Sequence, residues 1–258
     1  MKKILLALTL SLLMVSCTNN PTKTDHPVAQ ELLVSNQIIV GISPDYPPFE
    51  NLNIKGEIEG FDIDMLNSVI EILNKNEELN LTVTWKSMDF DTIVGALQAS
   101  QIDIGVSGFT YDASRDVYFS LPYIISQQVV VAKDDAGINS SSDLKGKKVG
   151  VQSGTTGEEA AGEIEGVSLV SLADAQQLFA QLQTNAIDAV VIDKAVGDSY
   201  VKNNSGYFVL PEPLIDENMS IIVNKKAVNL QKALDKAIAE FLASDKYADL
   251  LNKWEISQ

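Results

Sequence analysis

The stretch 102-IDIGVSGFTYDASR-115 is an apolar run that passes into a polar segment and ends in a cation. Its apolar residues are typical of a buried strand and are supplied by Ile102, Ile104 and Val106. Parallel sheets bind ligands beyond the carboxyl ends of their strands, so the residues that follow this strand are the first candidates for a functional site.

The polar segment offers groups that could hold a small acid. Ser107, Gly108 and Thr110 bring small polar side chains and backbone N–H groups. Arg115 brings a planar fork of donors suited to a carboxylate. An isolated arginine more often pairs with a neighbouring surface aspartate, so the stretch alone leaves both interpretations open.

Strand-like runs alternate with helical patterns on both sides of this stretch, which predicts an α/β fold with crossover helices. The predicted strands cover residues 38–42, 81–85, 102–106, 129–132, 148–151, 189–192, 207–210 and 220–223. Helices are predicted to open near residues 60, 91, 158 and 230, with further helical faces near 178–182 and 247–254. Asp62 and Asp64 lie in the first turn of the first helix, where the dipole favours negative charge, so a structural role suffices for them.

An internal echo relates two parts of the chain. LQASQID at residues 97–103 recurs as LQTNAID at residues 182–188, after a second amphipathic helix. The two copies lie farther apart than the roughly 20–50 residues of solenoid repeats, so we interpret them as two lobes of related design. In this register Gly108 corresponds to Asp193, so one lobe would offer a cation at its strand end and the other a carboxylate. A zwitterion between the lobes would satisfy both charges; alternatively, Asp193 is a helix N-cap.

Two further loops each allow a structural and a functional interpretation. Tyr46 and Phe49, on the proline-rich loop 43-SPDYPPFE-50, form either a packing cluster or a wall against which a ligand stacks. The segment 152-QSGTTG-157 is either a dipole site at the start of a helix or a plain N-cap by one of its threonines. No lysine follows its glycines as a phosphate-binding P-loop requires.

Charge and composition exclude several function classes. The 258 residues carry a formal charge of -16, which disfavours nucleic acid as a partner because that binding depends on many Lys and Arg. The apolar fraction of 45% is typical of a globular protein. The single histidine, His26, lies in a segment predicted to be a tether, so metal ligation and histidine-based catalysis are poorly supported.

The N-terminus has the pattern of a secretory signal, residues 1–16, with two lysines before an apolar run. The only cysteine, Cys17, follows in MVSC, which resembles the bacterial lipobox and predicts lipidation of its thiol. Because one acyl chain holds a membrane weakly, a stable anchor implies multiple acylation. Residues 17–36 are polar and contain two prolines, which predicts a flexible tether.

Long, ordered segments across nearly the whole mature chain resemble one protein family. They are IIVGISPDYPPFE, GFDIDML, MDFDTIVGALQ, IDIGVSGFTYDASR, LKGKKVGVQSGTTGEEAA, NAIDAVVID and KYADLLNKW. The family is the bacterial extracellular solute-binding proteins, family 3, the substrate-binding lipoproteins of polar amino-acid ABC transporters.

The resemblance implies the α/β fold of type II periplasmic binding proteins. Each of two lobes would be a mostly parallel sheet flanked by helices, and two hinge crossovers would join them. Lobe 1 would cover residues 37–123 and 220–258, lobe 2 would cover 128–215, and the hinges would lie at about 123–127 and 216–220.

The resemblance also implies a ligand site. Arg115 would clamp the ligand α-carboxylate with Thr110 and the backbone at Gly108, and Asp193 would pair with the α-ammonium. The remaining implied ligand contacts are Ser43, Tyr46, Phe90, Ser107, Gln152, Thr155 and Thr156. Ser43 stands where well-known members often carry an aspartate that reaches the ligand side chain, so the identity of the ligand is not carried over.

The function implied is capture of a polar L-amino acid between the lobes and delivery to an ABC permease and its ATPase. The protein would be a monomer without cofactor or catalytic residue, held outside the cytoplasm on a bacterial membrane by its lipid. Two alternatives are a ligand-binding sensor on the cell surface and an enzyme of the cyclohexadienyl-dehydratase kind on the same fold. The enzyme would need an acid or base in the cleft, for which Asp193 is the candidate.

Overall fold

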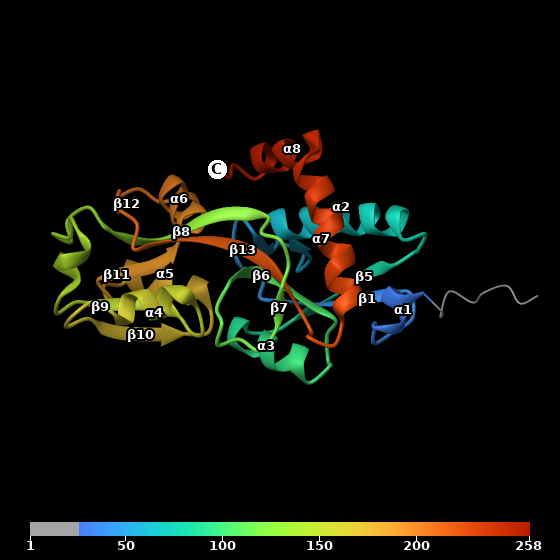
Figure 1. The fold of residues 1–258 in the computed structure, drawn as a ribbon. Helices are drawn as coiled ribbons and strands as arrows, with labels where there is room; N and C mark the ends of the chain where they lie inside the picture. The colour runs from blue at the N-terminus through green and yellow to red at the C-terminus, as the bar shows by residue number, and fades with distance from the viewer. Residues whose placement is uncertain (1–25) are drawn as a thin grey trace, which may run out of the picture.

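The computed structural model describes residues 26–258, which form two α/β halves on one continuous sheet (Figure 1). The strand order across this sheet is β10-β9-β11-β8-β13-β6-β1-β5, with β7 and β12 paired to it at the side. The predicted signal peptide and the predicted lipidation of Cys17 lie outside the described residues.

The first half holds three main strands, a small separate sheet of three short strands, and the helices that cover them. Its elements are α1 (Pro27–Gln30), β1 (Gln37–Ile42), β2 (Asp45–Tyr46), β3 (Glu50–Leu52), β4 (Ile58–Glu59), α2 (Phe61–Asn76), β5 (Thr82–Ser87), α3 (Phe90–Gln98), β6 (Ile104–Thr110), β7 (Tyr118–Phe119), α7 (Val228–Leu242) and α8 (Asp245–Lys253). The two C-terminal helices pack on α2, so the end of the chain returns to the half in which it began.

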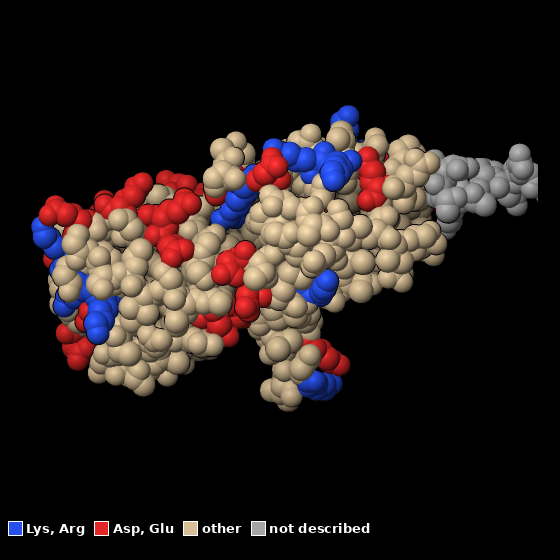
Figure 2. Space-filling view, turned by 90° about the horizontal axis from the view of Figure 1, so that it is seen from below, with Lys and Arg blue, Asp and Glu red and all other residues tan. Residues whose placement is uncertain are grey.

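The second half follows the same plan. Its elements are the 3-10 helix η2 (Ser141–Leu144), β9 (Lys148–Gln152), α4 (Thr156–Gly162), β10 (Ser168–Leu172), α5 (Ala175–Gln183), β11 (Ala189–Asp193), α6 (Lys194–Asn203) and β12 (Tyr207–Val209). On the face shown in Figure 2, Asp and Glu side chains gather on part of this half.

Two long strands, β8 (Ile124–Lys133) and β13 (Ile215–Val223), run between the halves (Figure 1). Residues 124–128 of β8 pair antiparallel with residues 215–219 of β13. Beyond this segment β8 pairs with β11 of the second half, and β13 pairs with β6 of the first. The predicted crossovers, at about 123–127 and 216–220, overlap this paired segment, and they stay a prediction together with the lobe boundaries.

The internal echo of the sequence corresponds to a repeated structural unit. α3 and α5 each end in a turn through a residue in the left-handed region, Ser100 with φ 54° and Asn185 with φ 59°. Asp103 and Asp188 then each accept a hydrogen bond from a backbone N–H of the adjacent parallel strand, β1 or β9, at 2.7 Å. The two halves are therefore built on related supersecondary units, as the echo predicted.

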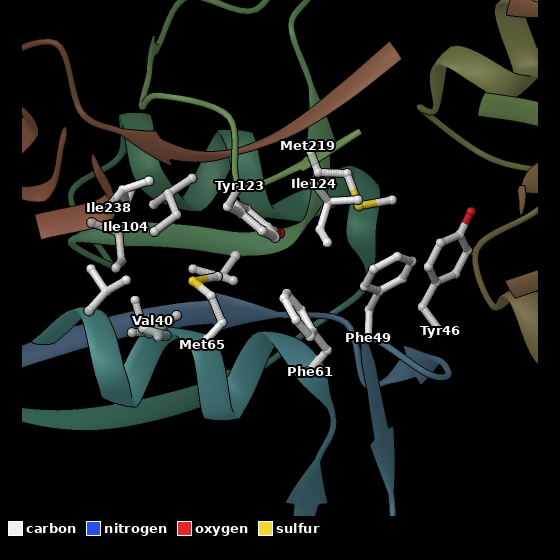
Figure 3. Close-up of a cluster of buried hydrophobic side chains, with 14 of the residues drawn as sticks. Val40, Tyr46, Phe49, Phe61, Met65, Ile104, Tyr123, Ile124, Met219 and Ile238 are labelled. Carbon is white, nitrogen blue, oxygen red and sulfur yellow. The ribbon is translucent and has the colours of Figure 1, made fainter. Parts of the chain in front are cut away.

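The core of the first half lies between α2, α7 and the sheet (Figure 3). The apolar face predicted for α2 is buried in full, at Phe61, Met65, Leu66, Val69, Ile70 and Leu73. The rings of Phe61, Phe49 and Tyr46 form a row that leads outward from this core. Phe49 is fully buried, whereas the Tyr46 hydroxyl points away from the core (Figure 3). The loop therefore both packs the core and presents a polar group.

Two predictions about local structure need correction. The predicted tether extends to residue 36, but residues 27–30 form α1, because His26 caps its start and Val28 and Ala29 bury their side chains in the core. The strand predicted to break at Ser107 continues as β6 to Thr110, because the crossing strand β13 supplies hydrogen-bond partners along this segment.

Candidate functional site

A pocket lies where the carboxyl ends of β6, β9 and β11 face one another between the halves. Its lining consists of Asp45, Tyr46, Phe90, Ser107, Gly108, Thr110, Arg115, Gln128, Gln152, Thr155, Thr156 and Asp193. The structure thus brings together ten of the eleven residues named as ligand contacts from the sequence. Ser43 is absent from the lining, while Asp45 and Gln128 are additions. The cavity volume is only about 10 Å³, since the two halves contact each other directly around it.

Arg115, the sole arginine of the sequence, is held against this pocket by several contacts. Its Nε lies 3.3 Å from Asp112 Oδ2, which is the local ion pair considered from the sequence. Its Nη2 donates to the Gly154 carbonyl of the other half at 2.9 Å. The guanidinium carbon lies 5.7 Å and 5.4 Å from the ring centroids of Phe90 and Phe109, which stack on each other.

One edge of the Arg115 guanidinium is left without a partner. Nη1 is buried and has no hydrogen-bond partner among the described residues. Burial lowers the pKa of this group, and the nearby Asp112 carboxylate opposes that shift. A buried, unsatisfied donor costs about 1–3 kcal/mol, more when it is charged, so an anion at this edge would be stabilised.

Asp193 stands at the N-cap position of α6, yet its side chain does not cap the helix. Oδ1 accepts a hydrogen bond from Ser126 Oγ at 2.5 Å. Oδ2 accepts from Tyr46 Oη at 2.8 Å and from Gln128 Nε2 at 3.0 Å. The N-cap alternative therefore describes the backbone of Asp193 only, because the carboxyl group faces the pocket.

Asp45 links the two halves at another point of the pocket. Its Oδ2 accepts hydrogen bonds from Gln152 Nε2 at 2.9 Å and from the backbone N–H of Ala175 at 2.6 Å. Ser43 was predicted to contact the ligand, but it donates to Asp45 Oδ1 at 2.8 Å. The Asp45 carboxyl lines the pocket instead. Burial raises the pKa of Asp45 to about 6, against hydrogen bonds that lower it.

The threonines of 152-QSGTTG-157 have separate roles. Thr155 is the N-cap of α4, where its Oγ1 accepts from the Glu158 N–H at 3.2 Å, so the N-cap prediction is confirmed for this residue. Thr156 Oγ1 donates to Glu217 Oε2 at 2.7 Å, a contact to the crossing strand β13. Sequence analysis did not identify Glu217, which lies in a strand without a recognisable motif.

Beneath the pocket, two fully buried carboxyl groups meet. Glu50 accepts a hydrogen bond from Ser107 Oγ at 2.6 Å, and Asp62 accepts one from Tyr123 Oη at 2.8 Å. Their other oxygens, Glu50 Oε2 and Asp62 Oδ1, are buried and have no hydrogen-bond partner among the described residues. Burial raises the pKa of both carboxyls, so a proton on one of them is favoured. Asp62 lies in the first turn of α2 as predicted, but its carboxyl is buried beside Glu50 and accepts its hydrogen bond from Tyr123.

The Glu50–Asp62 pair predicts a stability that falls as the pH rises. Burial raises the pKa of Asp62 from 3.8 to about 7, so the folded protein binds more protons than the unfolded chain between about pH 4 and pH 7. Stability is thus greatest below pH 4 for this pair and is lost toward pH 7. Asn at position 62 can still accept from Tyr123 and can donate to Glu50. We expect Asp62→Asn to reduce the fall in Tm between pH 5 and pH 8 by several degrees, measured by thermal unfolding.

Asp64→Asn is the matched control, since Asp64 lies two residues away but pairs with Lys253 at the surface. It should leave the pH dependence as in the wild type. Equal pH profiles for Asp62→Asn and the wild type would show that the buried pair does not hold the proton.

A family comparison identifies the fold and the class of protein. The profile of the bacterial extracellular solute-binding proteins, family 3, matches residues 38–257. The chain belongs to this family. The match includes every residue of the pocket lining.

Individual family members are similar over most of their length. The arginine-binding extracellular protein ArtP of Bacillus subtilis is 31% identical over 225 residues, which cover 84% of this chain and 86% of that protein. A probable histidine-binding protein of Campylobacter jejuni is 30% identical over 99% of this chain and 100% of its own length. The solved structure of an ancestral arginine-binding protein bound to glutamine has a TM-score of 0.79 and 34% identity, covering 86% of this chain and 98% of that chain.

These comparisons confirm the two-lobe, type II periplasmic-binding-protein fold predicted from the sequence. They also place this family member among amino-acid solute-binding proteins of ABC transporters, whose named relatives are extracellular or periplasmic. Within residues 26–258, no helix combines the length and the apolar character needed to cross a bilayer.

Proposed function

We propose that the protein captures a polar L-amino acid between its two lobes, with the α-carboxylate on Arg115 and the α-ammonium on Asp193. The observation that carries the proposal is the unpartnered Nη1 edge of Arg115, which is buried in the same pocket as the Asp193 carboxyl. One cation from the first lobe and one carboxyl from the second match the two charges of an amino acid.

At the carboxylate end, the groups around Arg115 favour a planar anion. The aromatic pair Phe90–Phe109 and the Asp112 ion pair fix the guanidinium plane. A carboxylate could then take two parallel hydrogen bonds from the fork, which are stronger and more specific than those of a lysine. Thr110 and the backbone at Gly108 line the same side of the pocket.

At the side-chain end, the pocket favours a cationic or neutral polar group over an anionic one. Its lining contains the carboxyls of Asp45 and Asp193 against a single guanidinium, and Glu217 lies just behind it. A ligand carboxylate beyond the one on Arg115 would meet only like charge, at a cost of several kcal/mol in a desolvated site. Arginine, histidine, lysine and glutamine are therefore better candidates than glutamate.

Lobe closure follows from where the contacts lie. Hydrogen bonds from Arg115 to Gly154 and from Gln152 to Asp45 already join the lobes across the pocket. A zwitterion adds one charged partner to each lobe, so it binds the closed state better and shifts the equilibrium toward it. The paired segment of β8 and β13 is the proposed hinge, at about 123–127 and 216–220, between lobe 1 (37–123 and 220–258) and lobe 2 (128–215).

The closed, loaded protein would then deliver its ligand to an ABC permease served by an ATPase. We further propose that a lipid on Cys17 holds the mature protein on the outer side of a bacterial membrane, after removal of residues 1–16. The bacterial lipobox pattern supports this anchor. Mass spectrometry of the protein from a membrane fraction tests it, since an unmodified Cys17 peptide contradicts it.

A thermal-shift screen followed by calorimetry tests the capture proposal. A ligand at about a hundredfold over its Kd adds about 2.7 kcal/mol of stability, which is roughly 5–10 °C of Tm for a chain of this size. We expect such a shift with at least one of L-arginine, L-histidine, L-lysine and L-glutamine, and none with L-glutamate. D-arginine is the control for recognition of both α-groups. If none of the L-amino acids shifts the Tm, the proposal is overturned.

A further inference from the structure

The carboxyl of Asp193 has a second carboxyl beside it, that of Glu217 on the crossing strand β13. Gln128 Nε2 donates to both, at 3.0 Å to Asp193 Oδ2 and at 2.6 Å to Glu217 Oε1. Both side chains are buried, at 4% and 6% exposed, and their carboxyls converge on the same amide nitrogen. Two ionised carboxyls this close in a buried site would repel each other, which favours a proton on one of them.

The surroundings of this pair supply neutral donors but no adjacent cation. Ser126 and Tyr46 hydroxyls bind Asp193, and the Thr156 hydroxyl binds Glu217. Among residues 26–258, neither carboxyl forms an ion pair with a Lys or Arg within 4.0 Å. The arrangement therefore resembles carboxyl dyads in which like charge in a low dielectric keeps one member protonated.

Other titratable groups act on the pair only from farther away. The Arg115 guanidinium interacts with Glu217 through space, where Glu159 also contributes negative charge. The neighbour Lys194 turns to Asp198 on its own helix. Asp216, next to Glu217 on β13, turns to Gln127 instead. Burial, followed by the charge of Glu217, raises the pKa of Asp193 well above its usual range.

We propose that the Asp193–Glu217 pair holds one shared proton and releases it when a ligand ammonium binds, which makes amino-acid capture proton-linked through Glu217. This inference rests on the proposed function for its ligand. The ammonium brings a permanent positive charge to the pair, so the second carboxyl ionises and the proton passes to solvent. One proton leaves for each amino acid bound, and the ammonium offsets the one negative charge that this release adds to the pair.

The direction of the pH dependence follows from this exchange. Where the free pair is protonated and the bound pair is not, ligand affinity rises with pH. The release of one proton raises the association constant by up to about tenfold per pH unit, since one proton changes the free energy by 2.303RT per unit. Glu217→Gln keeps a neutral partner beside Asp193, so its affinity should depend less on pH.

Calorimetry with L-arginine in buffers of different ionisation enthalpy measures the proton release at pH 6 to 8. We expect the wild type to release close to one proton, and Glu217→Gln to release clearly less, because Asp193 then lacks the like charge beside it. Asp216→Asn, a change on the same strand outside the pair, should release protons like the wild type. Undiminished release in Glu217→Gln, or wild-type binding without release, overturns the inference.

An infrared measurement on the ligand-free protein separates this inference from the proposed function. The pair predicts the carbonyl band of a protonated carboxyl at neutral pH, weaker in Glu217→Gln than in the wild type. Asp62→Asn accounts for the contribution of the Glu50–Asp62 pair. If L-arginine does not bind but the band is weaker in Glu217→Gln, the protonated pair is supported and the proposed ligand is wrong. If the band is the same in Glu217→Gln and the wild type, the protonated pair is refuted.

Discussion

Arg115→Ala should lower the affinity for the amino-acid ligand by about thirtyfold to a few thousandfold while the protein stays folded. Removal of one partner from a buried, hydrogen-bonded charge pair costs about 2–5 kcal/mol, and a tenfold change in Kd corresponds to 1.4 kcal/mol. The ligand carboxylate would lose its only guanidinium, since the sequence contains no other arginine. Stability should change little, because the substitution also removes the buried, unpartnered Nη1. Calorimetry and thermal unfolding together measure both effects.

Two further variants separate the role of the guanidinium from that of lobe contacts. Arg115 also donates to Gly154 across the lobes, so part of the loss could come from weaker closure. Ser153→Ala removes a different interlobe hydrogen bond, from Ser153 Oγ to Asp91 at 3.3 Å, and should change affinity less than threefold. Arg115→Lys keeps the charge but not the fork and should recover only part of the binding. Wild-type affinity in Arg115→Ala would refute the carboxylate clamp.

Most of the pocket was predictable because its residues lie at positions with a local signal. Arg115 and Thr110 follow a recognisable strand, and Asp193 corresponds to Gly108 in the internal echo. Since the chain reuses one supersecondary unit, an inference about one strand end carries to the other. The amino-acid sequence alone therefore sufficed to pair the two strand ends across a cleft.

The residues that sequence analysis missed reach the site through tertiary structure alone. Gln128 and Glu217 belong to the crossing strands β8 and β13. Gln128 reaches Asp193 through the antiparallel pairing of β8 with β11, and Glu217 through the pairing of β13 with β8. Glu50 and Asp62 are fully buried although acidic residues are usually exposed, so composition gives no hint of their pairing. These carboxyls are tolerated inside because a hydroxyl or amide donor from another element binds at least one oxygen of each.

Ser43 was predicted to contact the ligand, but Asp45 lines the pocket instead. The difference shows that resemblance alone does not assign the contact residue within a short rigid loop. The two residues are separated by one proline, and the backbone turns so that the Asp45 carboxyl bridges to Gln152 while Ser43 supports it. A motif match fixes the loop but not which of its side chains faces the pocket. In the same way, buried Val28 and Ala29 end the tether earlier than its polar composition predicted.

Asp193→Asn should also reduce ligand affinity by about a hundredfold or more, with unchanged or higher stability at neutral pH. Asn is close in shape and can accept the hydrogen bonds of Ser126 or Tyr46, but it offers no charge to the ligand ammonium. Because burial and Glu217 raise the pKa of Asp193, its ionised form is disfavoured in the folded protein, and a neutral amide removes that cost. Loss of binding without loss of stability is the combination that identifies a ligand-pairing carboxylate.

Asp103→Asn provides the opposite combination and serves as the matched control. Asp103 is equally buried, at 4% exposed, but its oxygens accept the backbone N–H groups of Leu33 and Ile39 outside the pocket. An amide can replace only one of these acceptors, so this variant should lose stability by about 1–3 kcal/mol and keep its affinity. If Asp193→Asn bound the ligand within threefold of the wild type, the ammonium would have to be held elsewhere, because the carboxyl facing the pocket would then be dispensable.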